Sequence, residues 1–154
     1  MECVRSSTTA EIAVQPPVPL RILVVEDEAL IAVLLTEVLG AMGHDVCGVE
    51  NSEAAAVIAA ARCQPDLMIV DVGLRVGSGI CAVTQILHRR FVPHVFVTSR
   101  RLSTDALDPG AVVLQKPFDE GDLDQAMQRA LRQGIGRDAA DPVGTGLPRP
   151  TPPK

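Results

Sequence analysis

Short apolar runs alternate with longer amphipathic segments through the middle of the chain. Runs such as LRILVVE and DLMIVD are largely apolar and end in a carboxylate, which is typical of strands buried on both faces of a sheet. The segments between the runs repeat apolar residues every three or four positions, which is typical of helices. We expect strands at residues 20–26, 45–50, 66–71, 93–99 and 111–115.

Helices are expected at residues 28–43, 52–63, about 80–87 and 119–133, each after one of these strands. Ser52 and Asp119 are candidate N-caps, and Gly43 is a candidate helix stop. The apolar faces expected to pack on the sheet are Leu30, Leu34 and Val38; Ile80, Val83 and Leu87; and Leu123, Met127 and Ala130 or Leu131.

This alternation of strand and helix predicts an α/β fold. The sheet should be open and mostly parallel, covered by helices on both faces and connected by right-handed crossovers. We expect the strand at residues 20–26 to be the central one. In such doubly wound sheets, ligands bind beyond the carboxyl ends of the strands, near the point where the winding direction reverses.

The apolar pattern is confined to one part of the chain. Residues 1–19 contain Ser, Thr and three prolines without a strand or helix period, and are expected to form a flexible arm. Residues 134–154 hold four Gly and five Pro, which predicts a disordered tail. One folded domain is therefore expected at residues 20–133.

The composition of the 154-residue chain argues against two kinds of partner. Three Phe, with no Trp or Tyr, leave little surface on which nucleic acid bases could stack. A formal net charge of -5 gives no electrostatic attraction to nucleic acid or to an anionic membrane. We therefore expect no nucleic acid and no membrane partner.

Cysteine usage and the first residues predict a cytoplasmic protein. Cys3, Cys47, Cys63 and Cys81 have no spacing typical of a zinc site, and are expected to be reduced thiols, three of them in packed segments. The first fifteen residues have no continuous apolar stretch like that of a signal peptide, and no apolar stretch is long enough to span a membrane.

Polar residues follow the predicted strands at the edge where parallel strands end together. Clustered carboxylates without Cys or His favour a hard cation, Mg2+ above all, which takes oxygen ligands and keeps positions open for water and phosphate. A carboxylate beside Mg2+ can act as a nucleophile toward a phosphoryl group, while an ammonium group and a hydroxyl stabilise its oxygens. The residues concerned are Glu26 and Asp27, Asp71, Thr98 and Ser99, and Lys116.

Four motifs in this order resemble the receiver domain of bacterial two-component response regulators: VVEDE, VDVGLRVGSG, VFVTS and QKPF. Each motif is weak alone, but the set is specific, with 44 residues from Asp27 to Asp71 and Gly79 eight residues further on. The resemblance covers the first strand and about residues 27–133, which is roughly three quarters of the chain. It implies a five-stranded parallel sheet with flavodoxin-like (βα)5 winding, in a stand-alone response regulator.

The resemblance also implies a phosphoacceptor and a metal site. Asp71 would be phosphorylated by a histidine kinase or a phosphotransfer protein. Mg2+ would be held by Asp27, Asp71 and the backbone carbonyl oxygen of Gly73, and by Glu26 through a water molecule.

Further roles implied by the resemblance concern the switch. Thr98 would follow the phosphoryl group, Lys116 would contact it, and the Lys116–Pro117 peptide would be cis. The protein would signal through contacts with a downstream protein that the sequence does not identify. It would not be an enzyme, any hydrolysis being confined to its own aspartyl-phosphate.

Several of these residues have simpler interpretations. Glu26 could face solvent or pair with Lys116. Glu28 is expected in the first turn of the helix, where its negative charge suits the helix dipole. Arg75 and Arg100 flank the crevice, but we favour solvated loop charges for both. Surface positions are expected for His44, His88 and His94, since none lies at the carboxyl end of a strand.

Two departures from the family pattern concern signal output. Val113 stands three positions before Lys116, where many receivers have a switching aromatic residue. Only 17 residues separate Thr98 from Lys116, so the fourth helix is limited to one or two turns around residues 103–107. Many receivers dimerise or bind partners through this helix and the following strand and helix. The departures put that output route in question, but not the phosphorylation chemistry.

Two other functions compete with a phosphorylated receiver. A degenerate receiver could act as a phosphorylation-independent binding module, which Val113 and the short fourth helix would fit. A phosphohydrolase of the haloacid dehalogenase type also uses an Asp nucleophile on a doubly wound sheet. Its DxDx(T/V) motif is replaced here by DVGL, with Gly73 in place of the general acid, so we favour the phosphorylated receiver.

Overall fold

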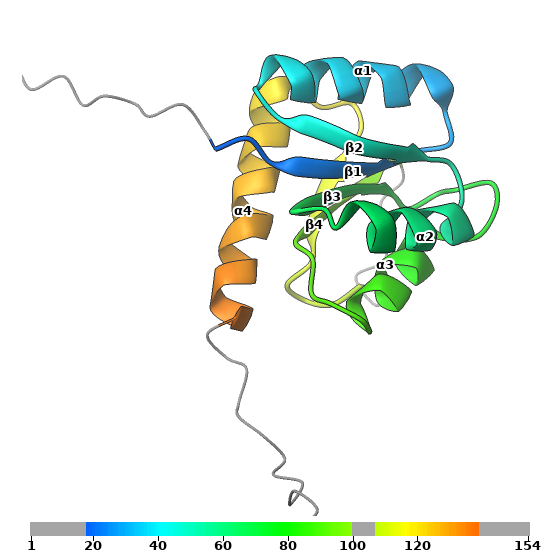
Figure 1. Ribbon diagram of the computed structural model, residues 1–154. Coiled ribbons are helices and arrows are strands. Elements are labelled where there is room, and N and C mark those ends of the chain that lie inside the picture. Colours follow the sequence, from blue (N-terminus) through cyan, green and yellow to red (C-terminus); the bar gives the residue numbers. More distant parts are fainter. Residues whose placement is uncertain (1–17, 100–106, 139–154) are drawn as a thin grey trace, which may run out of the picture.

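Five parallel strands form one sheet in the order β2-β1-β3-β4-β5 in the computed structural model, which describes residues 18–99 and 107–138 (Figure 1). The expected α/β fold with a parallel sheet is confirmed. The strands are β1 (Arg21–Val25), β2 (Asp45–Glu50), β3 (Leu67–Asp71), β4 (His94–Thr98) and β5 (Val112–Gln115). The helices are α1 (Ala29–Ala41), α2 (Glu53–Cys63), α3 (Gly79–Leu87) and α4 (Glu120–Asp138).

The central strand is β3, not β1 as the sequence suggested. All five residues of β3 are buried, and β3 lies between β1 and β4. Both β1 and β3 are continuously apolar, because each has two neighbouring strands and is covered on both faces. A continuous apolar run therefore identifies a strand inside the sheet, but not its position in the order of strands.

Helices cover both faces of the sheet (Figure 1). On one face, α1 and α4 pack on side chains that include Ile22 and Val24 of β1. On the other face, α2 and α3 pack on Leu23 and Val25, the alternate residues of the same strand. The period of two along the strand thus supplies both layers of the core.

The buried face of α1 differs from the expected one. Leu30 and Leu34 are 72% and 51% exposed, whereas Ala32, Leu35 and Leu39 are buried. The sequence ALIAVLLTEVLGA is apolar around almost the whole helix, so its periodicity does not select a face. Packing of α1 on the sheet selects it.

Helix α4 buries Leu123, Met127 and Ala130 as predicted, but it continues to residue 138. The expected domain end at 133 and tail from 134 are therefore wrong by five residues. Gly134 belongs to the helix, where a Cβ atom would lie 3.0 Å from Cγ of Pro93. Glycine here allows α4 to approach the segment before β4, so it does not mark the helix end.

Both expected helix caps, Ser52 and Asp119, are confirmed. Ser52 accepts a hydrogen bond from the Ala55 N–H at 3.3 Å, and Asp119 accepts one from the Asp122 N–H at 2.8 Å. Glu28, however, lies at the N-cap position before α1 and not in its first turn. At the other end of α1, the expected stop Gly43 has a φ of 89°, a backbone conformation that favours glycine.

Some expectations lie outside the described residues. These are the arm at residues 1–17, most of the short fourth helix, Arg100, and the tail after residue 138. Among the helices that the structure describes, none combines the length and the apolar character that crossing a membrane requires.

Candidate functional site

Polar side chains from β1, β3 and β5 meet at the carboxyl edge of the sheet. Glu26 and Asp27 follow β1, Asp71 is the last residue of β3, and Lys116 follows β5. The Lys116 N–H donates a 2.8 Å hydrogen bond to the carbonyl oxygen of Thr98, the last residue of β4. Extension of the parallel ladder therefore brings groups from distant parts of the sequence to one crevice.

Three carboxylates form a compact cluster in this crevice. Glu26, Asp27 and Asp71 can each offer one oxygen, and these oxygens lie within 4.8 Å of one another. Glu26 is only 2% exposed and Asp71 is 9% exposed. The cluster contains oxygen donors alone, which is the ligand type that Mg2+ takes in proteins.

Lys116 is the cation inside this cluster. Its Nζ donates a 3.0 Å hydrogen bond to Oε2 of Glu26, and it lies 3.7 Å from Oδ2 of Asp71. Of the two alternatives for Glu26, pairing with Lys116 is the one observed. The Lys116–Pro117 peptide is cis, as expected.

Burial and neighbouring charges act together on the two partners of this ion pair. Burial raises the pKa of Glu26 above its usual value, and the nearby Asp71 charge raises it further, while the Lys116 hydrogen bond lowers it. For Lys116, burial favours a lower pKa, but the hydrogen bond to Glu26 and the charges of Asp71 and Glu26 outweigh it and raise the pKa. The ammonium group of Lys116 therefore stays charged at neutral pH.

The turn after β3 is shaped around the backbone of Asp71. The Gly73 N–H donates a 3.0 Å hydrogen bond to Oδ1 of Asp71, which fixes the carboxylate. A Cβ atom on Gly79 would lie 2.0 Å from the carbonyl oxygen of Asp71, a distance that no side chain tolerates. The glycine eight residues after Asp71 is thus required for α3 to start against the end of β3.

Arg75 contacts Asp27, a pairing that the sequence did not predict. The Arg75 N–H donates a 2.7 Å hydrogen bond to Oδ2 of Asp27, and its Nε lies 3.6 Å from the same oxygen. The Arg75 side chain is nevertheless 78% exposed, in agreement with a solvated loop charge. Both contacts are made by Oδ2, and among the residues that the structure describes Oδ1 of Asp27 has no hydrogen bond or ion pair.

Glu53, at the start of α2, is a second residue that sequence reasoning missed. Its carboxylate accepts hydrogen bonds from the Ser78 N–H at 2.9 Å and from Nε2 of Gln85 at 2.6 Å. Gly77 lies against Glu53 with a φ of 81°. Glu53 thereby fixes the loop that carries Gly73. The only sequence signal for this close contact was the number of glycines in the loop.

The remaining predicted residues take up varied positions. Thr98 is 6% exposed at the end of β4, and Ser99 after it is exposed. His94 starts β4, at the opposite end of the strand from Thr98. Of the three histidines expected at the surface, His88 is exposed, whereas His44 and His94 are half-buried. Of the thiols expected in packed segments, Cys63 is buried and Cys47 half-buried, whereas Cys81 is exposed.

Comparison with known sequences identifies the family of the chain. The family model of the response regulator receiver domain matches residues 22–128. The transcriptional regulatory protein PdtaR of Mycobacterium tuberculosis is 39% identical over 118 residues, covering 74% of this chain and 58% of that protein. The phyllosphere-induced regulator PhyR of Methylorubrum extorquens is 35% identical over 114 residues, covering 71% of this chain and 43% of PhyR. The chain thus spans about half the length of these relatives.

Solved structures agree with the sequence comparison. The crystal structure of the response regulator PhyR from Brucella abortus is similar with a TM-score of 0.68 and 30% identity, over 80% of this chain and 53% of that one. The solution structure of the receiver domain of PhyR from Erythrobacter litoralis has a TM-score of 0.66 and 30% identity, over 84% of this chain and 97% of that domain.

Proposed function

Because the chain belongs to the response regulator receiver domain family, we propose that Asp71 accepts a phosphoryl group from a histidine kinase or a phosphotransfer protein. The observation that carries this proposal is the contact of Lys116 with Asp71 inside the acidic cluster. A carboxylate that accepts a phosphoryl group gains negative oxygens, and the half-buried ammonium group of Lys116, 3.7 Å away, can stabilise them.

The reaction proposed is an in-line phosphoryl transfer. An oxygen of Asp71 forms a bond to phosphorus while the bond from phosphorus to the donor imidazole nitrogen breaks, and the electron pair of that bond leaves with the imidazole. The product is an aspartyl-phosphate. Such a transfer asks the protein chiefly for positioning and charge stabilisation, which Lys116 and the fixed Asp71 carboxylate supply.

A divalent cation fits the charge of the site. Three carboxylates face Lys116 in the crevice and the largely exposed Arg75 at its edge, so the buried negative charge exceeds the buried positive charge. We propose that Asp27, Asp71 and the carbonyl oxygen of Gly73 hold Mg2+, and that Glu26 acts through a water molecule. Bound Mg2+ would neutralise charge on the carboxylates and on the phosphoryl oxygens.

Thr98 and a protein target complete the proposed signalling function. Thr98 is buried at the end of β4, next to the strand that leads to Lys116. We propose that its hydroxyl follows the phosphoryl group and that the resulting change at β4 and β5 alters contacts with a downstream protein.

The test is a phosphoryl transfer assay on the whole chain. With Mg2+ and acetyl phosphate, the intact mass of the wild type should increase by one phosphoryl group, and that of Asp71→Asn should not. The matched control is Asp66→Asn, an acid in the loop before β3 outside the crevice. No mass increase in the wild type, or an equal increase in Asp71→Asn, would overturn the proposal.

One observation keeps the phosphorylation-independent binding module as a second candidate. Val113 on β5 is 38% exposed where many receivers have a switching aromatic residue. If this candidate is right, Asp71→Ala will bind the cognate partner as tightly as the wild type does. If phosphorylation controls the contact, acetyl phosphate will change the affinity of the wild type and not that of Asp71→Ala.

A further inference from the structure

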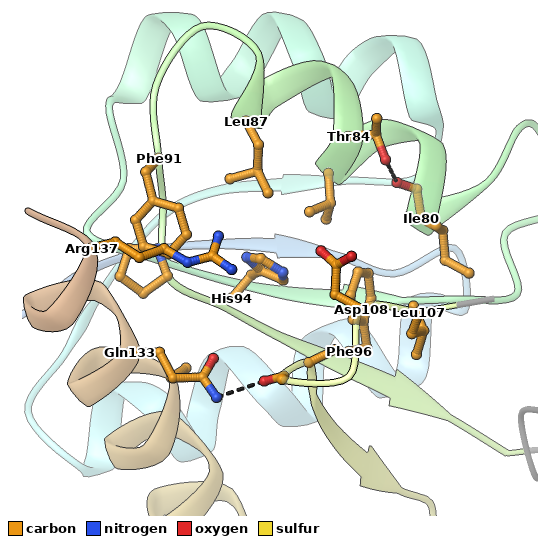
Figure 2. A pocket seen from close by; sticks show the side chains of 15 residues that line it. Ile80, Thr84, Leu87, Phe91, His94, Phe96, Leu107, Asp108, Gln133 and Arg137 are labelled. Atoms are coloured by element: carbon orange, nitrogen blue, oxygen red, sulfur yellow. Dashed lines mark hydrogen bonds between the residues drawn. The ribbon is translucent and has the colours of Figure 1, made fainter. Parts of the chain in front are cut away.

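A hollow of about 130 Å³ lies at the amino ends of β4 and β5, away from the carboxylate cluster (Figure 2). Helices α3 and α4 and the turn before β5 form its sides. Its apolar wall consists mainly of Ile80, Leu87, Phe96 and Leu107. A cavity of roughly 150 Å³ holds a benzene molecule, so a ligand with a few apolar carbons is of suitable size.

Two opposite charges face each other across this hollow. Figure 2 shows the Arg137 guanidinium on one side, the Asp108 carboxylate on the other, and the His94 ring between them. Arg137 lies over the ring of Phe91 at 4.9 Å, and it has no carboxylate within ion-pair distance among the described residues. The Asp108 carboxylate likewise has no ion pair or hydrogen bond in that part of the chain.

His94 adds a hydrogen-bond acceptor to the hollow. Its Nδ1 lies 2.9 Å from the carbonyl oxygen of Val92, which can only accept, so Nδ1 carries the hydrogen. Burial lowers the pKa of His94, and the imidazole is therefore neutral at pH 7. In this tautomer Nε2 is an acceptor, and the ring is held edge-on against Phe96 at 5.1 Å.

The two charged groups of the hollow are thus separated. Asp108 accepts hydrogen bonds at one side, Arg137 donates them at the other, and the His94 ring with its acceptor Nε2 lies between them. Gln133 also lines the hollow, but its Nε2 already donates a hydrogen bond to the carbonyl oxygen of Gly110 at 2.6 Å. It therefore does not alter this arrangement of charges. Acceptors match an ammonium group, the guanidinium matches a carboxylate, and the apolar wall matches a short aliphatic side chain.

We propose that this hollow binds a small zwitterion, an α-amino acid with an aliphatic side chain of about the size of valine. The ammonium group of the ligand lies between Asp108 and His94, its carboxylate pairs with Arg137, and its side chain contacts Phe96 and Ile80. This site does not depend on phosphorylation of Asp71, and the same binding is expected of Asp71→Asn.

Calorimetry with three ligands tests the zwitterion. L-valine carries both charges, 3-methylbutanoate lacks the ammonium group, and isobutylamine lacks the carboxylate. L-valine should bind at least about tenfold more tightly than either analogue, because each analogue leaves one charge of the hollow unpaired. No binding of L-valine up to about 10 mM, or equal binding of 3-methylbutanoate, overturns the proposal.

Substitutions at the two exposed charged residues of the hollow test which groups bind the ligand. Arg137→Gln and Asp108→Asn should each weaken L-valine binding at least about tenfold, while Arg132→Gln on the same helix and Asp45→Asn on β2 leave it unchanged. Far-UV circular dichroism and the urea midpoint check that all four variants are folded. Unchanged affinity in folded Arg137→Gln or Asp108→Asn refutes the site.

Discussion

At the scale of single residues, Lys116 is what makes the buried Glu26 carboxylate tolerable. The two side chains lie 3.0 Å apart, and Glu26 is almost completely removed from solvent. A buried carboxylate loses its solvation, and the one backbone hydrogen bond that Glu26 accepts, from the Glu28 N–H at 3.1 Å, does not replace a cation. The stability of the protein should therefore depend on the pair and not on either member alone.

Lys116→Met should lower the free energy of unfolding by about 1–3 kcal/mol at pH 7, because it leaves Glu26 buried and unpaired. The double variant Glu26→Gln/Lys116→Met removes both charges and should recover most of this loss. Urea unfolding of the four proteins of this cycle gives the coupling between the two residues. A double variant whose loss equals the sum of the single losses would contradict the interpretation.

His94 should make stability depend on pH. Burial holds its pKa below the ordinary value of 6.5, so the unfolded chain binds more protons than the folded protein as pH falls through 6.5. The contribution of His94 is therefore complete above pH 6.5 and is lost as pH falls toward its lowered pKa.

The measurement compares wild type with His94→Gln in urea at pH 8 and pH 5.5. The difference in unfolding free energy between the two proteins should be larger at pH 8, because only the wild type loses the His94 contribution on acidification. A difference that grows at pH 5.5 would show that the pKa of His94 is raised and not lowered.

Sequence pattern could supply the acids, the hydroxyl and the lysine of the crevice, but not the contacts that hold them. Glu26, Asp71 and Lys116 follow apolar strands directly, and parallel strands end at one edge, so their convergence follows from local pattern. Arg75 pairs with Asp27 across 48 positions, and Glu53 with Ser78 across 25. Neither pair produces a local pattern in the sequence, because each forms only when a loop folds back onto a distant part of the chain.

At the scale of elements, the start of α3 is fitted to the end of β3 without space for a side chain. Gly79→Ala would place Cβ 2.0 Å from the Asp71 carbonyl oxygen, so α3 or the end of β3 must move. We expect a loss of about 1–3 kcal/mol in unfolding free energy, with a weaker phosphoryl uptake because Asp71 moves too.

Gly40→Ala is the matched control for this substitution. Gly40 lies near the end of α1, and a Cβ atom there has no heavy atom within 4 Å. Alanine should leave phosphoryl uptake unchanged and stabilise the helix by roughly 0.5–1 kcal/mol. Equal effects of the two substitutions on urea unfolding would contradict the tight fit at Gly79.

Element types were predictable because each strand is an apolar run with marked ends. The buried face of a helix and the residue at which it ends were less predictable. In α1 the apolar residues surround the helix, so Leu30 and Leu34 looked as suitable for burial as Leu35 and Leu39. In α4, Gly134 looked like a helix end because glycine is common there, but it lies within the helix and allows close packing against Pro93. Both errors arise where tertiary packing overrides local preference.

At the scale of the whole molecule, the acidic crevice should make the folded state respond to divalent cations. The unfolded chain has no such cluster, so Mg2+ that binds the folded protein must stabilise it. At a Mg2+ concentration ten times the Kd, the gain should be about 1.4 kcal/mol.

Thermal unfolding with MgCl2, against NaCl at equal ionic strength, measures this gain as a rise in Tm. Asp27→Asn should reduce the rise, while Asp45→Asn on β2 should retain it. A Tm that responds equally to both salts would show that the acids are not a cation site.

The alternation of strand and helix was enough to predict the parallel sheet and its two helical layers, because few topologies satisfy it. The alternation alone does not give the order of the strands, and β3 holds the central place that we expected for β1. The observed order is the flavodoxin-like winding that the family resemblance implied.

The 90-residue separation between Glu26 and Lys116 has a consequence for how the protein is made. During synthesis, the acids after β1 leave the ribosome long before β5 is available, and the cation that compensates Glu26 arrives near the end of the domain. Contacts between distant residues form late, because closing a long loop is unfavourable until other contacts are present. The Glu26 carboxylate therefore lacks its lysine partner until the last strand pairs, and the crevice is complete only once the whole domain has been made.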